Sequence, residues 1–159
     1  MSNTVWKFTN QRELNKSQFI DYFERKVFRT IRKYQMLPKD KIVTLKDSNN
    51  LNTTILKKII GKKFPVSFST KPNLSSDNLS QIAEDVFKQI LKGDFKNKTP
   101  KNAPLYYLSD KEVELYAKLT NIKGTKRKQN SKIQKLFDKF LKKNQDLEVN
   151  ILKAIGQLN

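Results

Sequence analysis

Lysine and arginine are the side chains through which this sequence could do chemistry, and they form two clusters. The chain carries 33 of them against 15 acidic residues, a net charge of +18. Residues 121–143 form the denser cluster, which contains one acid, Asp138, and the candidate anion-binding residues Lys126, Arg127, Lys128, Lys132, Lys135, Lys139 and Lys142. Because like charges this close repel one another, the segment gains when it binds a polyanion and counterions are released. We predict a nucleic-acid contact here; the alternative is a solvated helix face beside a loop.

The second cluster lies on a predicted helix over residues 18–34. Its candidate nucleic-acid contacts are Arg25, Lys26, Arg29, Arg32 and Lys33. Tyr22, Phe28 and Tyr34 lie among these charges and could stack on unpaired bases, although aromatic residues at this spacing are also typical of a core. We expect the two clusters to form one RNA-binding surface, with the side chains of residues 126–128 exposed in a loop.

Cysteine and histidine are both absent. Their absence excludes thiolate nucleophiles, cysteine-bound zinc or iron–sulfur clusters, and imidazole bases. Glu112 and Glu114 are two apart on a predicted helix and point in different directions, so they cannot form a paired-carboxylate site. We therefore predict no catalytic residue, no metal and no cofactor, with carboxylate-bound magnesium as the one metal chemistry left open.

The elements that would position these residues alternate between helix and strand. Short β-branched or aromatic runs predict strands at 41–45 and 64–68, and residues 104–108 form a short extended segment. Apolar spacing and caps such as the Ser109–Glu112 capping box predict helices over 18–34, 53–60, 79–91, 109–119 and from 131 onward. Residues 147–155 are strand or helix. The sequence thus predicts an α/β fold.

One domain of 159 residues accounts for this pattern. We divide it into a basic helical segment (1–38), a reduced α/β core (39–108) and a second basic helical segment (109–159). The chain has no apolar run long enough to span a membrane, and Met1–Thr9 lacks the apolar core of a signal peptide. We expect a cytoplasmic protein without membrane partners.

The loop between the first predicted strand and the next helix occupies the place of a phosphate-binding loop in many nucleotide-binding folds. Its residues are Asp47, Ser48, Asn49 and Asn50. Glycine normally lets the backbone approach a phosphate, and this loop has none, while Asp47 would repel the anion. The loop is therefore interpreted as a helix cap.

Three blocks of this sequence resemble the PP-loop ATPases that thiolate tRNA, the archaeal and eukaryotic cytoplasmic 2-thiouridine synthetases. Residues 19–34 (FIDYFERKVFRTIRKY) are similar to the family's helix before its first strand, residues 78–94 to its "GHNLDDEAQTVLMNLLRGD" segment, and residues 104–117 (PLYYLSDKEVELYA) to its "PLRYIPEKEVALYA" segment. The blocks occur in family order. The resemblance implies a reduced Rossmann-like fold of the PP-loop, or adenine nucleotide alpha hydrolase-like, type and a basic surface that faces tRNA.

Departures from the family pattern fall on its catalytic residues. The family's "SGGKDS" pyrophosphate loop aligns with Asp47–Asn52, so Asp47, Ser48, Asn49, Asn50 and Asn52 would be a vestigial PP-loop without glycine. The family's Asp-Asp-Glu becomes Ser80-Gln81-Ile82, and its cysteines are missing. We interpret the chain as a truncated, degenerate member and expect that it is not an enzyme.

The resemblance thus predicts a non-catalytic tRNA-binding protein or accessory subunit related to wobble-uridine 2-thiolation. Its partners would be tRNA or another structured RNA and a catalytic PP-loop thiolation subunit. Two alternatives stay open: a helix-turn-helix DNA-binding regulator, built from the helix at 112–119, a turn at 121–124 and the basic helix from Ser131, and a divergent ATP-dependent tRNA thiolase.

Overall fold

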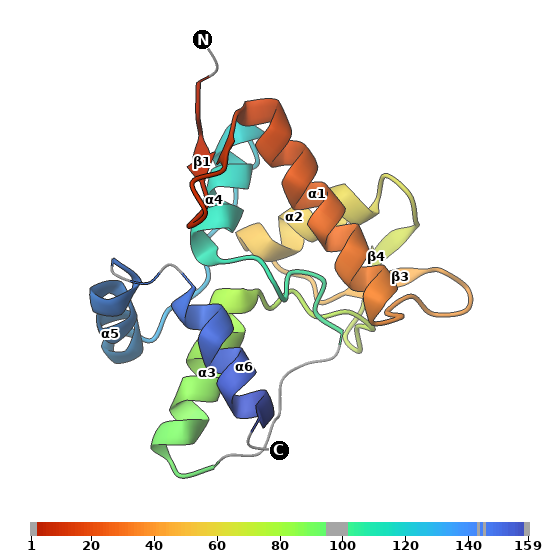
Figure 1. Ribbon diagram of the computed structural model, residues 1–159. Coiled ribbons are helices and arrows are strands. Elements are labelled where there is room, and N and C mark those ends of the chain that lie inside the picture. Colours follow the sequence, from red (N-terminus) through yellow and green to blue (C-terminus); the bar gives the residue numbers. More distant parts are fainter. Residues whose placement is uncertain (1–2, 95–101, 143, 145, 158–159) are drawn as a thin grey trace.

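A computed structural model describes residues 3–94, 102–142, 144 and 146–157. Along these residues the order of elements is β1 (Trp6–Lys7), β2 (Glu13–Leu14), α1 (Lys16–Lys33), β3 (Val43–Leu45), α2 (Leu51–Ile60), β4 (Val66–Phe68), α3 (Leu79–Leu91), α4 (Asp110–Leu119), α5 (Ser131–Leu141) and α6 (Leu147–Gln157). Figure 1 shows α1, α2 and α4 grouped around the strands β3 and β4, with α3, α5 and α6 on the other side of the molecule.

The predicted α/β core is confirmed as one β–α–β unit. Strands β3 and β4 pair in parallel, Val43 opposite Val66 and Leu45 opposite Phe68, and α2 connects them. Val43 and Leu45 are fully buried, while β4 lies at the surface with Phe68 41% exposed. A sheet of two short strands is small for this class, so helices supply most of the core.

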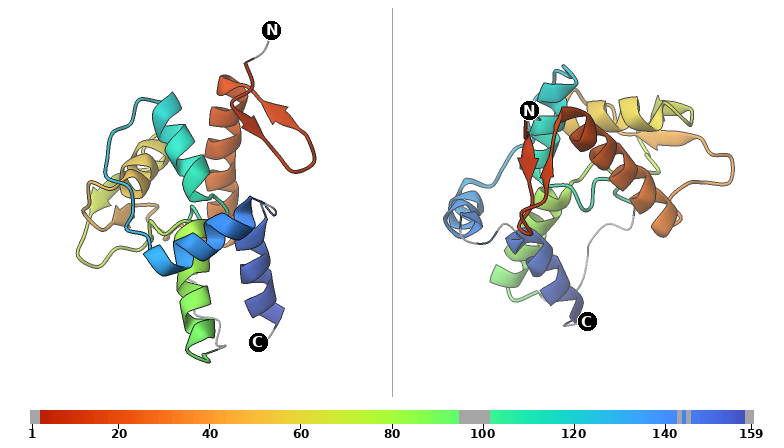
Figure 2. Two further views of the ribbon diagram at one scale, coloured as in Figure 1. Left: turned by 90° about the vertical axis from the view of Figure 1, so that its left-hand side faces the viewer. Right: turned by 45° about the horizontal axis from the view of Figure 1, so that its top comes forward.

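The main core forms where α1 and α4 pack over α2 and β3. Helix α1 contributes Phe19, Phe23, Val27 and Ile31 at helical spacing. The Phe23 ring stacks on Tyr116 of α4 with a centroid separation of 4.3 Å. A second and a third apolar cluster hold α6 and α5 against α3, as the two further views show (Figure 2).

Helix boundaries follow local hydrogen-bond chemistry. Asn15 caps α1 through a reciprocal box with Gln18, and Ser109 caps α4 through the predicted box with Glu112. Asn78 caps α3, and Gly93, at φ +77°, follows its last turn.

Two features differ from the sequence-based expectations, and residues 147–155, expected to be strand or helix, belong to a helix. Residues 103–108 form successive turns rather than an extended segment, with the Tyr106 N–H bonded to the Ala103 carbonyl. Residues 147–157 are helical, since Leu147, Ile151 and Leu152 pack on α3. The N-terminal hairpin β1–β2 was not predicted, because each strand contributes only two residues. No helix in the described part of the chain is both long and apolar enough to cross a membrane.

Glu148, in the first turn of α6, is buried, and its Oε2 has no hydrogen-bond partner among the described residues. Burial raises the pKa of Glu148 from 4.5 to about 6, although a hydrogen bond with Ser80 opposes the shift. A folded-state pKa above the unfolded value means that the folded protein binds more protons between these two pH values. The contribution of Glu148 to the free energy of unfolding is therefore fully present below pH 4.5, and it is lost as the pH rises through about 6 and the carboxyl ionises.

We expect Glu148→Gln to stabilise the protein at pH 7 by up to about 2 kcal/mol and to have little effect at pH 4, because the shift is about 1.5 pKa units. Urea unfolding of both proteins across this pH range measures the difference. A stability difference that does not change with pH would contradict the assignment of the shift to Glu148.

Candidate nucleic-acid interface

The N-terminus of α2 is the place in this fold where a phosphate could bind, and the chain itself occupies it. Asn50 caps the helix, and its Oδ1 accepts the Thr53 N–H at 2.8 Å. The Leu51 N–H donates to the Thr125 carbonyl at 2.8 Å, and the Thr125 N–H donates back to the Asn49 carbonyl at 3.1 Å. Two donors of the first turn are therefore already used.

Gly124 makes this close approach possible. A Cβ at Gly124 would lie 2.8 Å from the Asn49 carbonyl oxygen, a backbone atom that cannot easily move aside. Gly124 and Thr125 therefore lie directly on the loop that precedes α2.

The other residues of the vestigial PP-loop have structural roles or point to solvent. Ser48 Oγ accepts the Asn50 N–H at 3.2 Å, and the buried Asn52 side chain donates to the Ser76 carbonyl at 3.0 Å. Asp47 and Asn49 are exposed. The loop has the geometry of a helix cap, and the segment around Thr125 lies where an anion would approach.

Arg127 anchors that segment from the other side. Its Nε and Nη2 donate to the two carboxylate oxygens of Asp110 at 2.8 and 2.7 Å, a bidentate pair. Its Nη1 donates to Glu84 at 3.1 Å and to Gln81 at 3.2 Å. The Asn130 N–H also donates to Glu84, at 2.8 Å. We call Arg127, Asp110, Glu84 and Gln81 the arginine cluster.

The expectation that Arg127 is an exposed contact for nucleic acid is therefore wrong. Its side chain is 8% exposed, and those of Glu84 and Asp110 are 3% and 16% exposed. Within a run of lysines an arginine gives no sequence signal of burial, because its partners lie 17 and 43 residues away. The neighbours Lys126 and Lys128 are exposed as expected, and Lys126 pairs with Glu114 at 3.5 Å.

Lys26 is also less available than expected. Its Nζ donates to the Tyr22 hydroxyl at 2.9 Å, and that hydroxyl donates to the buried Glu112 at 2.6 Å. Burial lowers the pKa of Lys26, an effect that the nearby Glu112 carboxylate opposes. Lys26 lines a cleft of about 480 Å³ between the N-terminal hairpin, α4 and the α5–α6 region.

Three predicted lysines on one face of α5 and a fourth directly after the helix form a row. Lys132, Lys135, Lys139 and Lys142 follow one another at spacings of three and four, and all are exposed. The opposite face packs against α3 through Ile133 and Phe137. Among the described residues none of these lysines has an ion-pair partner. We call them the lysine row; Lys143, next in the sequence cluster, lies outside the described residues.

A second basic face runs along α1. Arg25, Arg29, Arg32 and Lys33 are exposed there, opposite the buried stripe, and Arg25 forms a surface ion pair with Asp21 at 3.0 Å. Figure 1 shows α1 at the upper right of the molecule and α5 at its left edge. The structure thus separates the two basic faces, and a single polyanion must extend across the molecule to contact both.

The helix-turn-helix alternative does not fit this arrangement. That motif joins two packed helices by a turn of three or four residues. Here residues 120–130 separate α4 from α5 and are held by Asn49, Leu51 and the arginine cluster, while α5 packs on α3.

Comparisons with known proteins bear on the fold. No protein-family model matches the chain, and no curated protein matches it. Among solved structures, the U34-tRNA thiolase NcsA from Methanococcus maripaludis, with its 4Fe-4S cluster, is similar at a TM-score of 0.76 and 15% identity. The match covers 98% of this chain and 84% of that chain. At this identity the similarity shows a shared fold, the expected Rossmann-like class with a reduced core.

The cluster of that thiolase has no counterpart here. Iron–sulfur clusters are held mainly by cysteine thiolates, and this sequence contains neither cysteine nor histidine. Among the described residues, no three acidic side chains are grouped so that they could hold a metal ion. The residues of this chain therefore do not fit an iron–sulfur cluster.

Removing Arg127 should destabilise the protein far more than removing its exposed neighbour. Arg127→Ala leaves the carboxylates of Glu84 and Asp110 buried without their cation, a change that costs about 3–5 kcal/mol. Lys128→Ala removes the same charge from the surface and should cost about 0.5 kcal/mol or less. Urea unfolding of both variants compares them; equal stabilities would show that the arginine cluster does not support the fold.

Proposed function

We propose that this protein binds tRNA without catalysing a reaction, as an accessory factor in wobble-uridine thiolation that works beside a catalytic PP-loop subunit. The observation that carries the proposal is the N-terminus of α2. In a fold shared with a U34-tRNA thiolase, the backbone of Thr125 fills the position from which helix N–H groups would otherwise contact a nucleotide phosphate.

Charge supports the RNA-binding half of the proposal. With a net charge of +18, the whole protein attracts polyanions. The lysine row adds four exposed cations that have no protein counterion among the described residues. Phosphates spaced along an RNA backbone would supply that counterion, and release of their own bound ions would drive association.

Active ATP-dependent thiolation is the less favoured function. It would require Gly124 and Thr125 to leave the N-terminus of α2, which breaks the hydrogen bonds of Thr125 with Leu51 and Asn49. The chain also offers no thiol to carry sulfur.

Calorimetry with ATP and magnesium should give no heat of binding. The expected reason is that the Thr125 carbonyl and the Asn50 side chain already accept the Leu51 and Thr53 N–H groups in the first turn of α2. A dissociation constant in the micromolar range would contradict the non-catalytic part of the proposal while leaving RNA binding untouched.

Binding to tRNA should weaken steeply with salt, and the lysine row should account for part of that dependence. Each phosphate contact contributes about 0.7–0.9 to the slope of log affinity against log salt, so Lys132→Ala, Lys135→Ala and Lys139→Ala together should reduce the slope by about 2–3. Filter binding at several salt concentrations measures the slope. The unfolding midpoint should change little, because these side chains are exposed.

A variant with the same loss of charge serves as the matched control. Lys39, Lys46 and Lys71 are exposed lysines in the loops around β3 and β4, away from α5. Their combined replacement with alanine should leave the slope close to the wild-type value. If both triple variants lose the same amount, the charge acts as a general field and the lysine row is not a binding site.

A further inference from the structure

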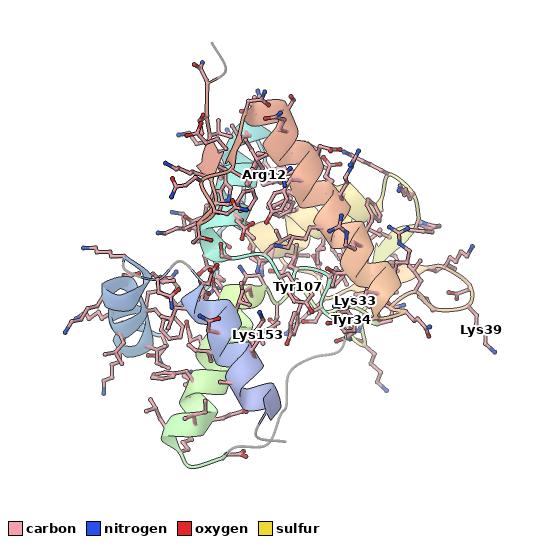
Figure 3. The ribbon with its side chains drawn as sticks, in the orientation of Figure 1. Arg12, Lys33, Tyr34, Lys39, Tyr107 and Lys153 are labelled. Atoms are coloured by element: carbon pink, nitrogen blue, oxygen red, sulfur yellow. The ribbon has the colours of Figure 1, made fainter. Side chains whose placement is uncertain are left out.

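Two exposed side chains, Lys33 and Tyr34, lie beside the half-buried Tyr107 where α1 ends. Tyr34 caps the C-terminus of α1 and is 42% exposed. Its ring stacks near Tyr107 with a centroid separation of 6.4 Å and an interplanar angle of 24°. Tyr106 packs edge-on against Tyr107 at 4.9 Å. Figure 3 shows Lys33, Tyr34 and Tyr107 close together at this end of the helix.

The rings are fixed relative to one another from two distant parts of the chain. The hydroxyls of Tyr34 and Tyr107 share a hydrogen bond, although 73 residues separate them in sequence. Tyr107 is held by the turns at 103–108, whose Leu105 and Leu108 are fully buried. A ligand that used these rings would therefore meet a preformed surface and would lose little of its binding energy to ordering them.

Lys33 gives this aromatic surface a charge. Its Nζ lies 5.3 Å from the ring centroid of Tyr34 and 5.5 Å from that of Tyr107, a cation–π arrangement. Among the described residues it has no carboxylate partner. Burial and the hydrogen bond to Tyr34 raise the pKa of Tyr107, so its ring stays neutral beside an anion. The exposed Arg29 and Arg32 lie on the preceding turn.

We propose that Lys33, Tyr34 and Tyr107 form a stacking platform for an unpaired nucleotide of RNA. The base stacks on the exposed tyrosine surface, and the ammonium of Lys33 contacts an adjacent phosphate. The inference rests on the proposed RNA binding and adds the form of RNA that this face of α1 recognises, a single-stranded loop or end. Aromatic rings beside cations are the usual means of holding unstacked bases, because every base has a π face.

Another exposed aromatic of the same fold provides a comparison. Phe68 on β4 is 41% exposed and has Lys57 Nζ 4.6 Å from its ring centroid. It lies on a different element from α1 and has no second ring in contact within the described residues. Phe68→Ala is therefore a matched control for the loss of one exposed, lysine-covered ring.

The test measures binding of a fluorescein-labelled, unstructured oligouridine to wild-type protein and to Tyr34→Ala, Tyr34→Phe and Phe68→Ala. Tyr34→Ala should weaken binding roughly five- to 150-fold, the effect of losing one stacked base. The slope against salt should not change, because no phosphate contact is removed. Tyr34→Phe keeps the ring and should retain most of the affinity, and Phe68→Ala should bind like wild type.

The outcomes separate this inference from the proposed function. If Tyr34→Ala binds oligouridine like wild type, or Phe68→Ala loses as much affinity, the platform does not exist, while salt-dependent tRNA binding can still hold. If wild-type protein binds tRNA but not oligouridine, the platform is also excluded. If wild-type protein fails to bind tRNA at all, the proposed function itself is wrong.

Discussion

The bidentate pair between Arg127 and Asp110 is the interaction on which the rest of this structure depends. It joins the irregular segment 120–130 to the first turn of α4, and the bonds from Arg127 and Asn130 to Glu84 join the same segment to α3. A buried arginine with two carboxylates is stable only if each charge has its partner, so the segment cannot shift without leaving a charge buried alone. The same segment contains Gly124 and Thr125, which contact the N-terminus of α2. Fixing the segment therefore also keeps these two residues in place against α2.

Function follows from which charges this arrangement uses and which it leaves free. Arg127, one cation of the basic segment, pairs with Asp110 and Glu84 and stabilises the fold, whereas the lysine row stays exposed to solvent. On the far side α1 leaves Arg29, Arg32 and Lys33 exposed beside a pair of hydrogen-bonded tyrosines. A fold in which the chain itself covers the N-terminus of α2 and the surface carries exposed cations is suited to holding a polyanion, as we propose.

The sequence predicts well those features that depend on residues close to one another along the chain. The caps at Asn50, Asn78 and Ser109, the strands around Val43 and Val66, and the buried stripe of α1 all follow from residues within a few positions of one another. Burial of Arg127 depends on partners in two other helices, and the closure of α2 depends on a backbone contact from Thr125, 74 positions along the chain from Leu51. Neither contact leaves a periodic signal. For Tyr34 the sequence allows base stacking or a place in the core, and the core is the commoner role at this spacing; in the structure Tyr34 is 42% exposed and hydrogen-bonded to Tyr107.

RNA recovered from living cells tests the proposed function most directly. Ultraviolet crosslinking of the full-length protein, followed by sequencing of the bound nucleic acid, identifies the partner without assuming its sequence. Binding through phosphates and an unpaired nucleotide predicts strong enrichment of tRNA, with crosslinked peptides that include Tyr34 or Tyr107. Recovery of duplex DNA, or of RNA in proportion to its cellular abundance without tRNA enrichment, would contradict tRNA binding as the function of this protein.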